Sequence, residues 1–318
     1  MFVVVGEALV DLVGQRGSRT LVAHPGGSPA NVALGLARLG DPVTLITRLG
    51  RDGFGEMVSA HLRASGVRVD AGPDAGVKTS LAVASLAAGA ATYDFRIEWD
   101  IGDLAPLPVE TRCVHTGSLA TALAPGAAQV TNLLERERER GRVTISYDPN
   151  VRPALLGSPE EARPGIEHLV SLSDVVKVSD EDLHWLYPDR RDQDVARDWL
   201  ALGAPVVVVT RGGEGVFAVT AHLELDRPAT PIDLVDTVGA GDSFTSGLLD
   251  GLRRADLVGG ERREALARID ESSLLSVLDE ASLIASITCS RPGADPPTWA
   301  EVETARTGPP SPQQSVPR

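Results

Sequence analysis

The sequence predicts an α/β protein with a central, mainly parallel sheet flanked by helices. Three observations support this fold class. Short runs rich in valine and isoleucine recur along the chain, and segments with helical periodicity separate them. Such alternation predicts parallel strands with helices on both faces of the sheet. Two further segments break the alternation and predict a small second sheet.

The apolar runs predict strands at 2–6, 42–47, 112–117, 142–148, 174–179 and 205–210. The segments with helical periodicity predict helices at 29–39, 54–65, 127–140, 192–202, 242–254 and 274–289. Ligands of open α/β sheets bind outside the carboxyl ends of the strands. Residues that directly follow the predicted strands are therefore candidates for function.

The amino terminus, MFVVVGEALVDLVGQRG, is interpreted as the first strand. No basic residue precedes its apolar stretch and two acidic residues interrupt it, which argues against a signal peptide. Segments 12–25 and 77–97 alternate polar and apolar residues and predict a small β lid. Residues 1–306 are predicted to form one domain, and the proline-rich segment 307–318 is predicted to be a disordered tail.

Composition and charge exclude several classes of protein. Hydrophobic residues make up 42% of the chain and charged residues 23%, which is typical of a globular enzyme. The net charge of −14 argues against nucleic-acid binding, which needs a basic face. No apolar run approaches the roughly 18–20 residues of a bilayer span, so no membrane partner is expected. Cys113 and Cys289 are too few for a disulfide framework, and a cytoplasmic location is expected.

The strongest local signal is the segment DTVGAGDSFTSGLLDGL. Gly239 and Gly241 flank Ala240 at the start of a predicted helix, so backbone N–H groups and the helix dipole can converge on a phosphate. Asp242 lies at the mouth of this anion hole, where a carboxylate can accept the proton of an attacking hydroxyl. The alternative interpretation is that Asp242 merely caps the helix.

A second segment, GGSPANVALGLARLG, joins a Gly-Gly turn to a predicted helix. Gly26 and Gly27 permit close approach of a ligand to the backbone. Asn31, in the first helical turn, can hydrogen-bond a polyol hydroxyl. Taken alone, this segment is equally well explained as a cap followed by a core helix.

Together the two segments resemble the signature pair of the pfkB-type, or ribokinase-like, carbohydrate kinase family. The resemblance covers nearly the whole chain and includes, in order, GEALVDL, DGFG, YDPNVRP, KVSDEDL, TRGGEGV and CSRPGADPP. Several ordered motifs at these separations make the match highly specific. The chain has no Walker A lysine motif, HExxH or GxSxG, which removes the main competing reaction classes. The resemblance implies a ribokinase-like fold and an ATP-dependent sugar kinase domain over 1–306.

The resemblance also implies roles for individual residues. Asp242 is the expected catalytic base, and Gly239, Ala240 and Gly241 are the expected anion hole. The expected sugar ligands are Asp11, Gly27 and Asn31. The expected nucleotide contacts are Lys177, Ser179, Thr210, Gly212 and Gly215. The expected backbone site for a monovalent cation consists of Asp236, Val238, Thr288 and Gly293.

The family's Asn-x-x-Glu motif, which tunes magnesium binding, appears here as Ser179 and Asp182. This departure keeps one carboxylate with a shorter reach, and Asp182 is the expected magnesium contact, through water. Phosphoryl transfer depends on positioning and on charge neutralisation. The resemblance accordingly implies ATP, Mg²⁺ and K⁺, with a small sugar as the second substrate. It is compatible with a homodimer, although the sequence does not fix the oligomeric state.

Two arginines bear on the identity of the acceptor. Arg96 in YDFR and Arg152 in DPNVR occur together as in the fructokinase branch of the family, so both are expected to bind a ketose. They could instead pair with the carboxylate of an acidic sugar, which keeps 2-keto-3-deoxygluconate kinase as an alternative. As surface residues, they would pair with nearby acidic side chains, namely Glu98, Asp94 or Asp148.

Two more alternatives stay open. Tyr93, Phe95 and Trp99 cluster in the predicted lid, which keeps a ribose- or adenosine-type kinase in consideration. A non-catalytic sugar-binding protein of the same fold would have lost the base or the glycine anion hole, and GAGD is intact. The favoured function is a catalytically competent fructokinase.

Overall fold

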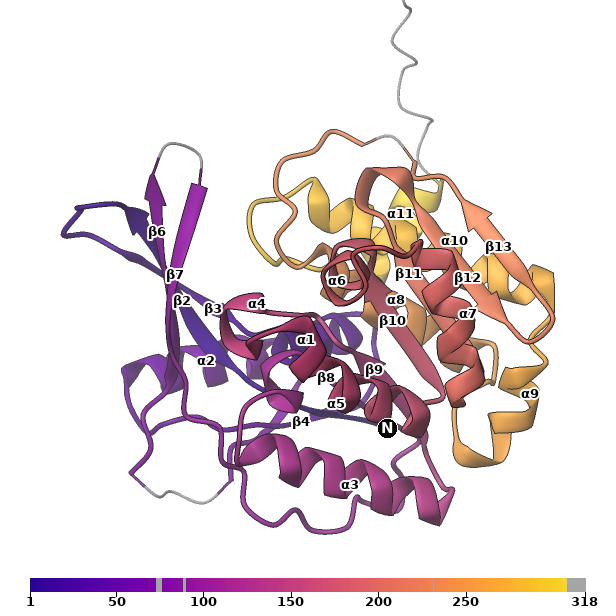
Figure 1. Cartoon of the computed structure of the whole chain (residues 1–318). Helices are drawn as coiled ribbons and strands as arrows, with labels where there is room; N and C mark the ends of the chain where they lie inside the picture. Colours follow the sequence, from indigo (N-terminus) through magenta and orange to yellow (C-terminus); the bar gives the residue numbers. More distant parts are fainter. Residues whose placement is uncertain (73–75, 88–89, 231, 308–318) are drawn as a thin grey trace, which may run out of the picture.

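The computed structural model describes residues 1–72, 76–87, 90–230 and 232–307, which form two sheets (Figure 1). The described strands of the main sheet are β1 (Phe2–Val5), β4 (Val43–Ile46), β5 (Arg68–Asp70), β8 (Cys113–Gly117), β9 (Thr144–Asp148), β10 (Val175–Ser179), β11 (Val206–Thr210), β12 (Val216–Thr220) and β13 (Glu224–Arg227). Those of the second sheet are β2 (Leu9–Gln15), β3 (Val22–Gly26), β6 (Ser80–Ala87) and β7 (Ala90–Arg96).

The main sheet has the strand order β13-β12-β11-β10-β9-β8-β1-β4-β5. Neighbouring strands from β11 to β5 pair in parallel, and β12 and β13 add an antiparallel hairpin at one edge. All the predicted strands are present, and the predicted fold class is confirmed. The sequence does not predict β5, β12 or β13. β5 and β13 are short and half exposed, so neither produces an apolar run.

Helices cover both faces of the main sheet (Figure 1). Those in the described residues are α1 (Ser28–Arg38), α2 (Gly53–Ala64), α3 (Gly126–Arg140), α4 (Pro153–Leu156), α5 (Pro159–Leu172), α6 (Asp180–Leu186), α7 (Asp192–Leu202), α8 (Ala240–Arg254), α9 (Arg263–Ala267), α10 (Glu271–Cys289) and α11 (Trp299–Thr307). Six of them match the predicted helices with bounds shifted by at most three residues. The sequence misses α5 because Pro164 interrupts its pattern, although Ser158 and Glu161 form a capping box at its start.

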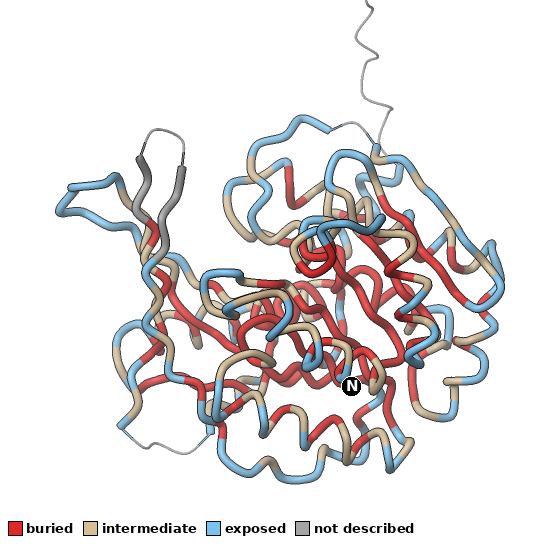
Figure 2. Tube along the Cα trace, viewed as in Figure 1, coloured by how far each residue is buried: buried red, intermediate tan, exposed pale blue. Residues whose placement is uncertain are grey.

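The core consists of two apolar layers, one on each face of the main sheet. The central strands of that sheet are buried between them (Figure 2). Val4 and Leu45 face the layer that packs against α1, α8 and α10. Val3 and Ile145 face the layer that packs against α3, α5 and α7. Successive residues of a strand point to opposite faces, so a sheet covered on both sides requires continuous apolar runs.

Helix α10 corrects one expectation. Among the described helices, it alone is long and apolar enough to cross a membrane, judged by length and composition only. The prediction that no segment approaches the length of a bilayer span is therefore wrong. In the structure α10 packs along α8, and Leu274, Leu278 and Ile284 are fully buried. This is the packing of a core helix.

The second sheet stands away from the main body (Figure 1) and has the strand order β3-β2-β6-β7. Both predicted lid segments contribute to it, but β2 begins at Leu9 instead of residue 12. The predicted first strand is present as β1, but it ends at Val5 and the chain then enters the second sheet. A Cβ on Gly6 would lie 2.2 Å from Cγ of Pro29, so this crossing against α1 requires glycine.

The carboxyl-terminal boundary also differs from the prediction. Helix α11 includes Thr307, which the sequence assigns to the disordered tail. Residues 308–318 lie outside the described residues, so disorder of the rest of that segment stays a prediction.

Candidate active site

The carboxyl ends of β9 and β10 meet the amino-terminal ends of α1 and α8 at one place in the fold. Ser28 and Asn31 of α1 hydrogen-bond Asp242 of α8. A Cβ on Gly241 of α8 would lie 3.1 Å from Nζ of Lys177 on β10. The structure thus brings together residues from distant parts of the chain where ligands of open α/β sheets bind.

Helix α8 begins within the Gly-Ala-Gly segment, at Ala240. Gly239 is its N-cap with a φ of +75°, a conformation that favours glycine, and a Cβ there would lie 2.6 Å from Cβ of Ala294. Asp242 lies in the first turn and does not cap the helix, so the alternative interpretation of this residue is wrong. The first-turn N–H groups of a helix attract an anion, which suits a phosphate beside Asp242.

Asp242 is almost fully buried and is held by two donors. The Ser28 hydroxyl donates to Oδ1 at 2.6 Å, and the Asn31 amide donates to Oδ2 at 2.8 Å. Burial raises the pKa of Asp242, while the hydrogen bonds from Ser28 and Asn31 and the charge of Lys177 oppose that rise. A carboxylate with a raised pKa is a better proton acceptor than an ordinary aspartate.

Lys177 is the positive group of this site. Its Nζ lies 2.7 Å from Oδ2 of Asp148, and both side chains are nearly inaccessible to solvent. Burial lowers the pKa of Lys177, but Asp148, Asp242 and Asp182 outweigh it and leave the pKa above its ordinary value. Lys177 is therefore a charged ammonium beside the anion loop.

Ser179 and Asp182 lie at the start of α6. Ser179 is the N-cap and accepts a hydrogen bond from the Asp182 backbone N–H at 3.0 Å. Oδ1 of Asp182 accepts from the Val151 backbone N–H at 3.0 Å. Burial, and then Asp148, raise the pKa of Asp182 to about 6. Oδ1 of Asp148 is buried without a hydrogen-bond partner among the described residues, so this pair of carboxylates has capacity for a hydrated cation.

The other predicted nucleotide contacts follow the adjacent strand. Thr210 ends β11 and is the register partner of Ser179 on β10. Gly212 and Gly215 follow it with φ values of +50° and +107°. A Cβ on Gly215 would lie 2.0 Å from the carbonyl oxygen of Arg227, so this turn requires glycine. The predicted nucleotide residues therefore lie on neighbouring strand ends.

Among the four predicted cation residues, Asp236 hydrogen-bonds two others, Val238 and Gly293. Its Oδ1 accepts from the Val238 N–H at 3.0 Å, and its Oδ2 accepts from the Gly293 N–H at 2.7 Å. Thr288 is buried, and its hydroxyl donates to Ser243 Oγ at 2.8 Å, directly after Asp242 in α8. The segments of Val238 and Gly293 are thus joined by Asp236, and Thr288 near the end of α10 contacts the first turns of α8.

Asp11 and Gly27 lie where the second sheet leads into α1. A Cβ on Gly26 would lie 2.0 Å from Oδ2 of Asp11, so glycine at that position makes room for the carboxylate. Gly27 has a φ of +104°, and a Cβ there would lie 2.5 Å from the Glu7 carbonyl oxygen. Glycine is therefore required at both positions, because a side chain at Gly26 would collide with Asp11 and one at Gly27 would collide with the Glu7 backbone.

The electrostatics of Asp11 connect it with the rest of the site. Burial raises its pKa, His24 and Arg152 oppose that rise, and Asp242 adds to it. Asp11 is thus within electrostatic reach of both Arg152 and Asp242. A sugar between these groups would meet acceptors on one side and a cation on the other.

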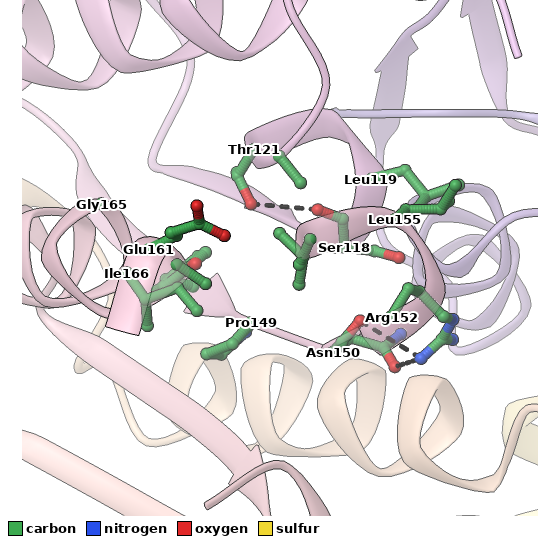
Figure 3. A pocket seen from close by; sticks show the side chains of 14 residues that line it. Ser118, Leu119, Thr121, Pro149, Asn150, Arg152, Leu155, Glu161, Gly165 and Ile166 are labelled. Atoms are coloured by element: carbon green, nitrogen blue, oxygen red, sulfur yellow. Dashed lines mark hydrogen bonds between the residues drawn. The ribbon is translucent and has the colours of Figure 1, made fainter. Parts of the chain in front are cut away.

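Arg152 lines a cavity of about 240 Å³ between β9, α4, α5 and the 3₁₀ turn that begins at Ser118 (Figure 3). Its Nη1 donates to Oδ1 of Asn150 at 2.6 Å and to the Asn150 carbonyl oxygen at 3.2 Å. Asn150 has a φ of +38°, and Ser118 on the same wall has a φ of +55°. Strained backbone of this kind clusters at functional sites.

Arg96 is not brought to this site. Its side chain is 74% exposed on β7, 4.0 Å from the Asp94 carboxylate, which matches the surface pairing considered for this residue. The aromatic cluster expected in the lid is also incorrect. Trp99 is buried in the core below β7 and donates to the Ala120 carbonyl oxygen at 2.9 Å. Phe95 is half buried, and the side chain of Tyr93 lies outside the described residues.

Sequence reasoning misses four residues of the site, namely Glu7, Ser28, Asp148 and Asn150. All four lie inside the motifs GEALVDL, GGSPANVALGLARLG and YDPNVRP, but nothing in the sequence shows that Ser28 contacts Asp242 or that Asp148 contacts Lys177. Glu7 is buried and accepts from the Ala120 N–H at 3.0 Å, and burial raises its pKa to about 7. The one usable signal is position, because Asp148 ends the strand β9 and Asn150 lies two residues beyond it.

Comparison with known proteins agrees with this geometry. The model of the pfkB family carbohydrate kinases matches residues 1–301. The chain belongs to the pfkB carbohydrate kinase family. It is therefore a sugar kinase, and the resemblance found in its motifs is confirmed.

Similar curated proteins are fructokinases. The fructokinase of Rhizobium leguminosarum bv. trifolii is 33% identical over 267 residues, which cover 81% of each chain. Fructokinase-1 of Oryza sativa subsp. japonica is 35% identical over 261 residues, or 77% of this chain and 80% of the relative.

Solved structures of similar fold include kinases with bound ligands. A fructokinase with bound ATP from Xylella fastidiosa has a TM-score of 0.81 at 26% identity, covering 95% of this chain and 97% of the other. A fructokinase double mutant from Vibrio cholerae O395, bound to fructose, ADP and potassium, has a TM-score of 0.79 at 26% identity with the same coverage. The ribokinase-like fold is thereby confirmed.

Proposed function

We propose that this pfkB-family kinase is an ATP-dependent fructokinase in which Asp242 is the general base. The observation that carries the proposal is the buried Asp242 carboxylate in the first turn of α8, beside the glycine anion loop and Lys177. The fructokinase relatives support fructose as the acceptor. ATP as the donor is supported by the ATP-bound solved neighbours.

In the proposed reaction a sugar hydroxyl oxygen attacks the γ-phosphorus of ATP. The bond from that phosphorus to the bridging oxygen breaks, ADP leaves, and the hydroxyl proton passes to Asp242. The amino terminus of α8, formed by Gly239, Ala240 and Gly241, stabilises the charge on the transferred group. Lys177 adds a full positive charge on the same side, while Asp11, Gly27 and Asn31 hold the sugar.

Magnesium and a monovalent cation are implied by the family. Bound magnesium would neutralise charge on the nucleotide phosphates, and a bound monovalent cation would add positive charge near the anion loop. Asp182 fits a magnesium held through water because a second buried carboxylate, Asp148, has a free oxygen beside it. Asp236, Val238, Thr288 and Gly293 are the residues that would hold the monovalent cation, since the Asp236 carboxylate brings the segments of Val238 and Gly293 together and such cations bind carboxylate and carbonyl oxygens.

A second acceptor is favoured by one observation. Arg152 uses only Nη1 in its hydrogen bonds to described residues, so Nε and Nη2 are available for a bidentate pair with a carboxylate. An acidic keto-sugar such as 2-keto-3-deoxygluconate fits that geometry. The two acceptors differ in charge, so a direct comparison separates them.

The test is a coupled assay of ADP release with fructose, 2-keto-3-deoxygluconate, ribose and adenosine at saturating ATP, Mg²⁺ and K⁺. Fructose is expected to give the highest kcat/KM. Turnover of another sugar without turnover of fructose would reject fructose as the acceptor, while the kinase activity would still stand. Binding of fructose without ADP release would identify a sugar-binding protein.

Arg152→Ala is expected to lower kcat/KM for fructose by about 10–100-fold, because a hydrogen bond to a charged group is lost. Most of the loss is expected in the fructose KM, with the ATP KM unchanged. Arg268→Ala is the matched control, since this exposed arginine at the end of α9 forms its one ion pair within the described residues with Glu264. An unchanged fructose KM in Arg152→Ala would contradict the sugar-contact role.

Activity is expected to be higher with K⁺ than with Na⁺, and Asp236→Ala is expected to lose that difference. The substitution removes the carboxylate that joins the two cation loops. The measurement is kcat at fixed ionic strength with K⁺, Na⁺ or tetramethylammonium. Equal rates with all three cations in the unmodified protein would remove the monovalent site from the proposal.

A homodimer and a cytoplasmic location are proposals that follow from the resemblance and the composition. Light scattering coupled to size-exclusion chromatography tests the first. The proposed partners of this kinase are the sugar and ATP.

A further inference from the structure

The first residue of α1 directs its hydroxyl away from its own helix. Gly27 is the N-cap of α1, and no side chain caps this helix end. A serine at a helix start commonly bonds the exposed backbone N–H groups there. Ser28 instead donates to Oδ1 of Asp242, 214 residues away in the chain, at 2.6 Å. Ser28 and Asp242 are only 9% and 8% exposed, so water competes little for this contact.

The two donors to Asp242 come from one turn of α1. Ser28 and Asn31 are three residues apart and therefore lie on the same face of the helix. Ser28 bonds Oδ1 and Asn31 bonds Oδ2. Asn31 is also a proposed sugar ligand, so Ser28 is the donor whose contact is with the base alone.

We propose that Ser28 is a positioning residue for the base: its hydroxyl fixes the Asp242 carboxylate in one orientation toward the acceptor hydroxyl and favours its ionised form. This inference rests on the proposed role of Asp242. A proton acceptor needs a defined geometry relative to the hydroxyl that it serves, and a short hydrogen bond to a carboxylate supplies it.

The groups around Asp242 determine in which direction its pKa changes when the Ser28 hydroxyl is removed. Lys177 faces it from β10, Asp148 from β9, and Asp11 from β2. Burial raises the pKa of Asp242, and the hydrogen bond from Ser28 is the largest influence that lowers it. Loss of the hydroxyl therefore raises the pKa, and the base becomes protonated at a higher pH.

The experiment measures kcat against pH for Ser28→Ala, with the acceptor that the unmodified enzyme phosphorylates best. The acid limb of the profile is expected to move to higher pH, with kcat reduced about tenfold on that limb and less on the plateau at higher pH. The sugar KM is expected to change less than kcat. Ser28→Thr restores a hydroxyl and is expected to recover the acid limb.

Ser246→Ala is the matched control. Ser246 is fully buried in α8, one turn after Asp242 and against Gly35 of α1, but its hydroxyl donates to the Ser243 carbonyl oxygen at 2.8 Å. The Ser246→Ala substitution removes a buried hydroxyl from the same interface between α1 and α8, but that hydroxyl does not contact Asp242. Its pH profile is expected to coincide with that of the unmodified enzyme.

The inference is overturned if the profile of Ser28→Ala coincides with the unmodified profile, or if Ser246→Ala shifts it equally. An Asp242→Asn variant with full activity would reject the proposed function instead. If no acceptor is turned over, the carboxyl itself is titrated by NMR in protein labelled with ¹³C at aspartate Cγ, with Asp242→Asn assigning the signal. A midpoint that is unchanged in Ser28→Ala overturns the inference, and a higher midpoint supports it.

Discussion

Asp242→Asn is expected to reduce kcat by about 10²–10⁴-fold, the usual contribution of a positioned general base. Asparagine has nearly the same shape as aspartate and cannot accept the hydroxyl proton as a carboxylate does. The Ser28 hydroxyl can still donate to the amide oxygen, so the packing of α1 against α8 is expected to survive. The change should therefore appear in the chemical step.

Binding separates this loss from misfolding. Calorimetric titration of Asp242→Asn with ATP and with fructose is expected to give dissociation constants close to those of the unmodified protein. Turnover near the unmodified rate would remove Asp242 from the role of base. Loss of both binding and turnover would indicate a damaged fold, which thermal unfolding would reveal.

Lys177→Met is expected to reduce kcat by about 10²–10³-fold, similar to the removal of one strong donor from an oxyanion hole. The ammonium lies beside the anion loop at Gly241, where it can neutralise charge on the transferred phosphoryl group. It also lowers the pKa of Asp242. The remaining activity of Lys177→Met is therefore expected to need a higher pH, because the base loses its proton less readily.

Removal of Lys177 leaves the Asp148 carboxylate buried without its partner, which destabilises a fold in its own right. The double variant Lys177→Met with Asp148→Asn removes both charges, so it is expected to recover the melting temperature without recovering kcat. Lys78→Met is the matched control, since Lys78 is the only other lysine and is exposed before β6. Recovery of kcat in the double variant would show that Lys177 acts only on stability.

Local patterns explain why much of this fold is predictable. The valine runs of β1, β10 and β11 are buried on both faces, and a continuous apolar run records that burial directly. β5 and β13 escape prediction because their side chains face solvent and their pairing depends on distant strands. The prediction for Trp99 is wrong because β7 ends at Arg96, three residues earlier, and the chain then enters the core. The short sequence distance between Phe95 and Trp99 does not reveal this change of direction.

The sequence by itself determined the strand and helix alternation, the glycine turn that begins α8, and the family motifs that carry Asp242 and Asn31. Each of these depends on residues that are close together in the chain, so composition and spacing record them. Only the tertiary structure decided that Ser28 holds Asp242 and that Lys177 pairs with Asp148. It also decided that Arg152 lies near Asp11 while Arg96 stays exposed on β7. These contacts join segments far apart in sequence, and their partners are set by sheet order and helix packing, which no local pattern records.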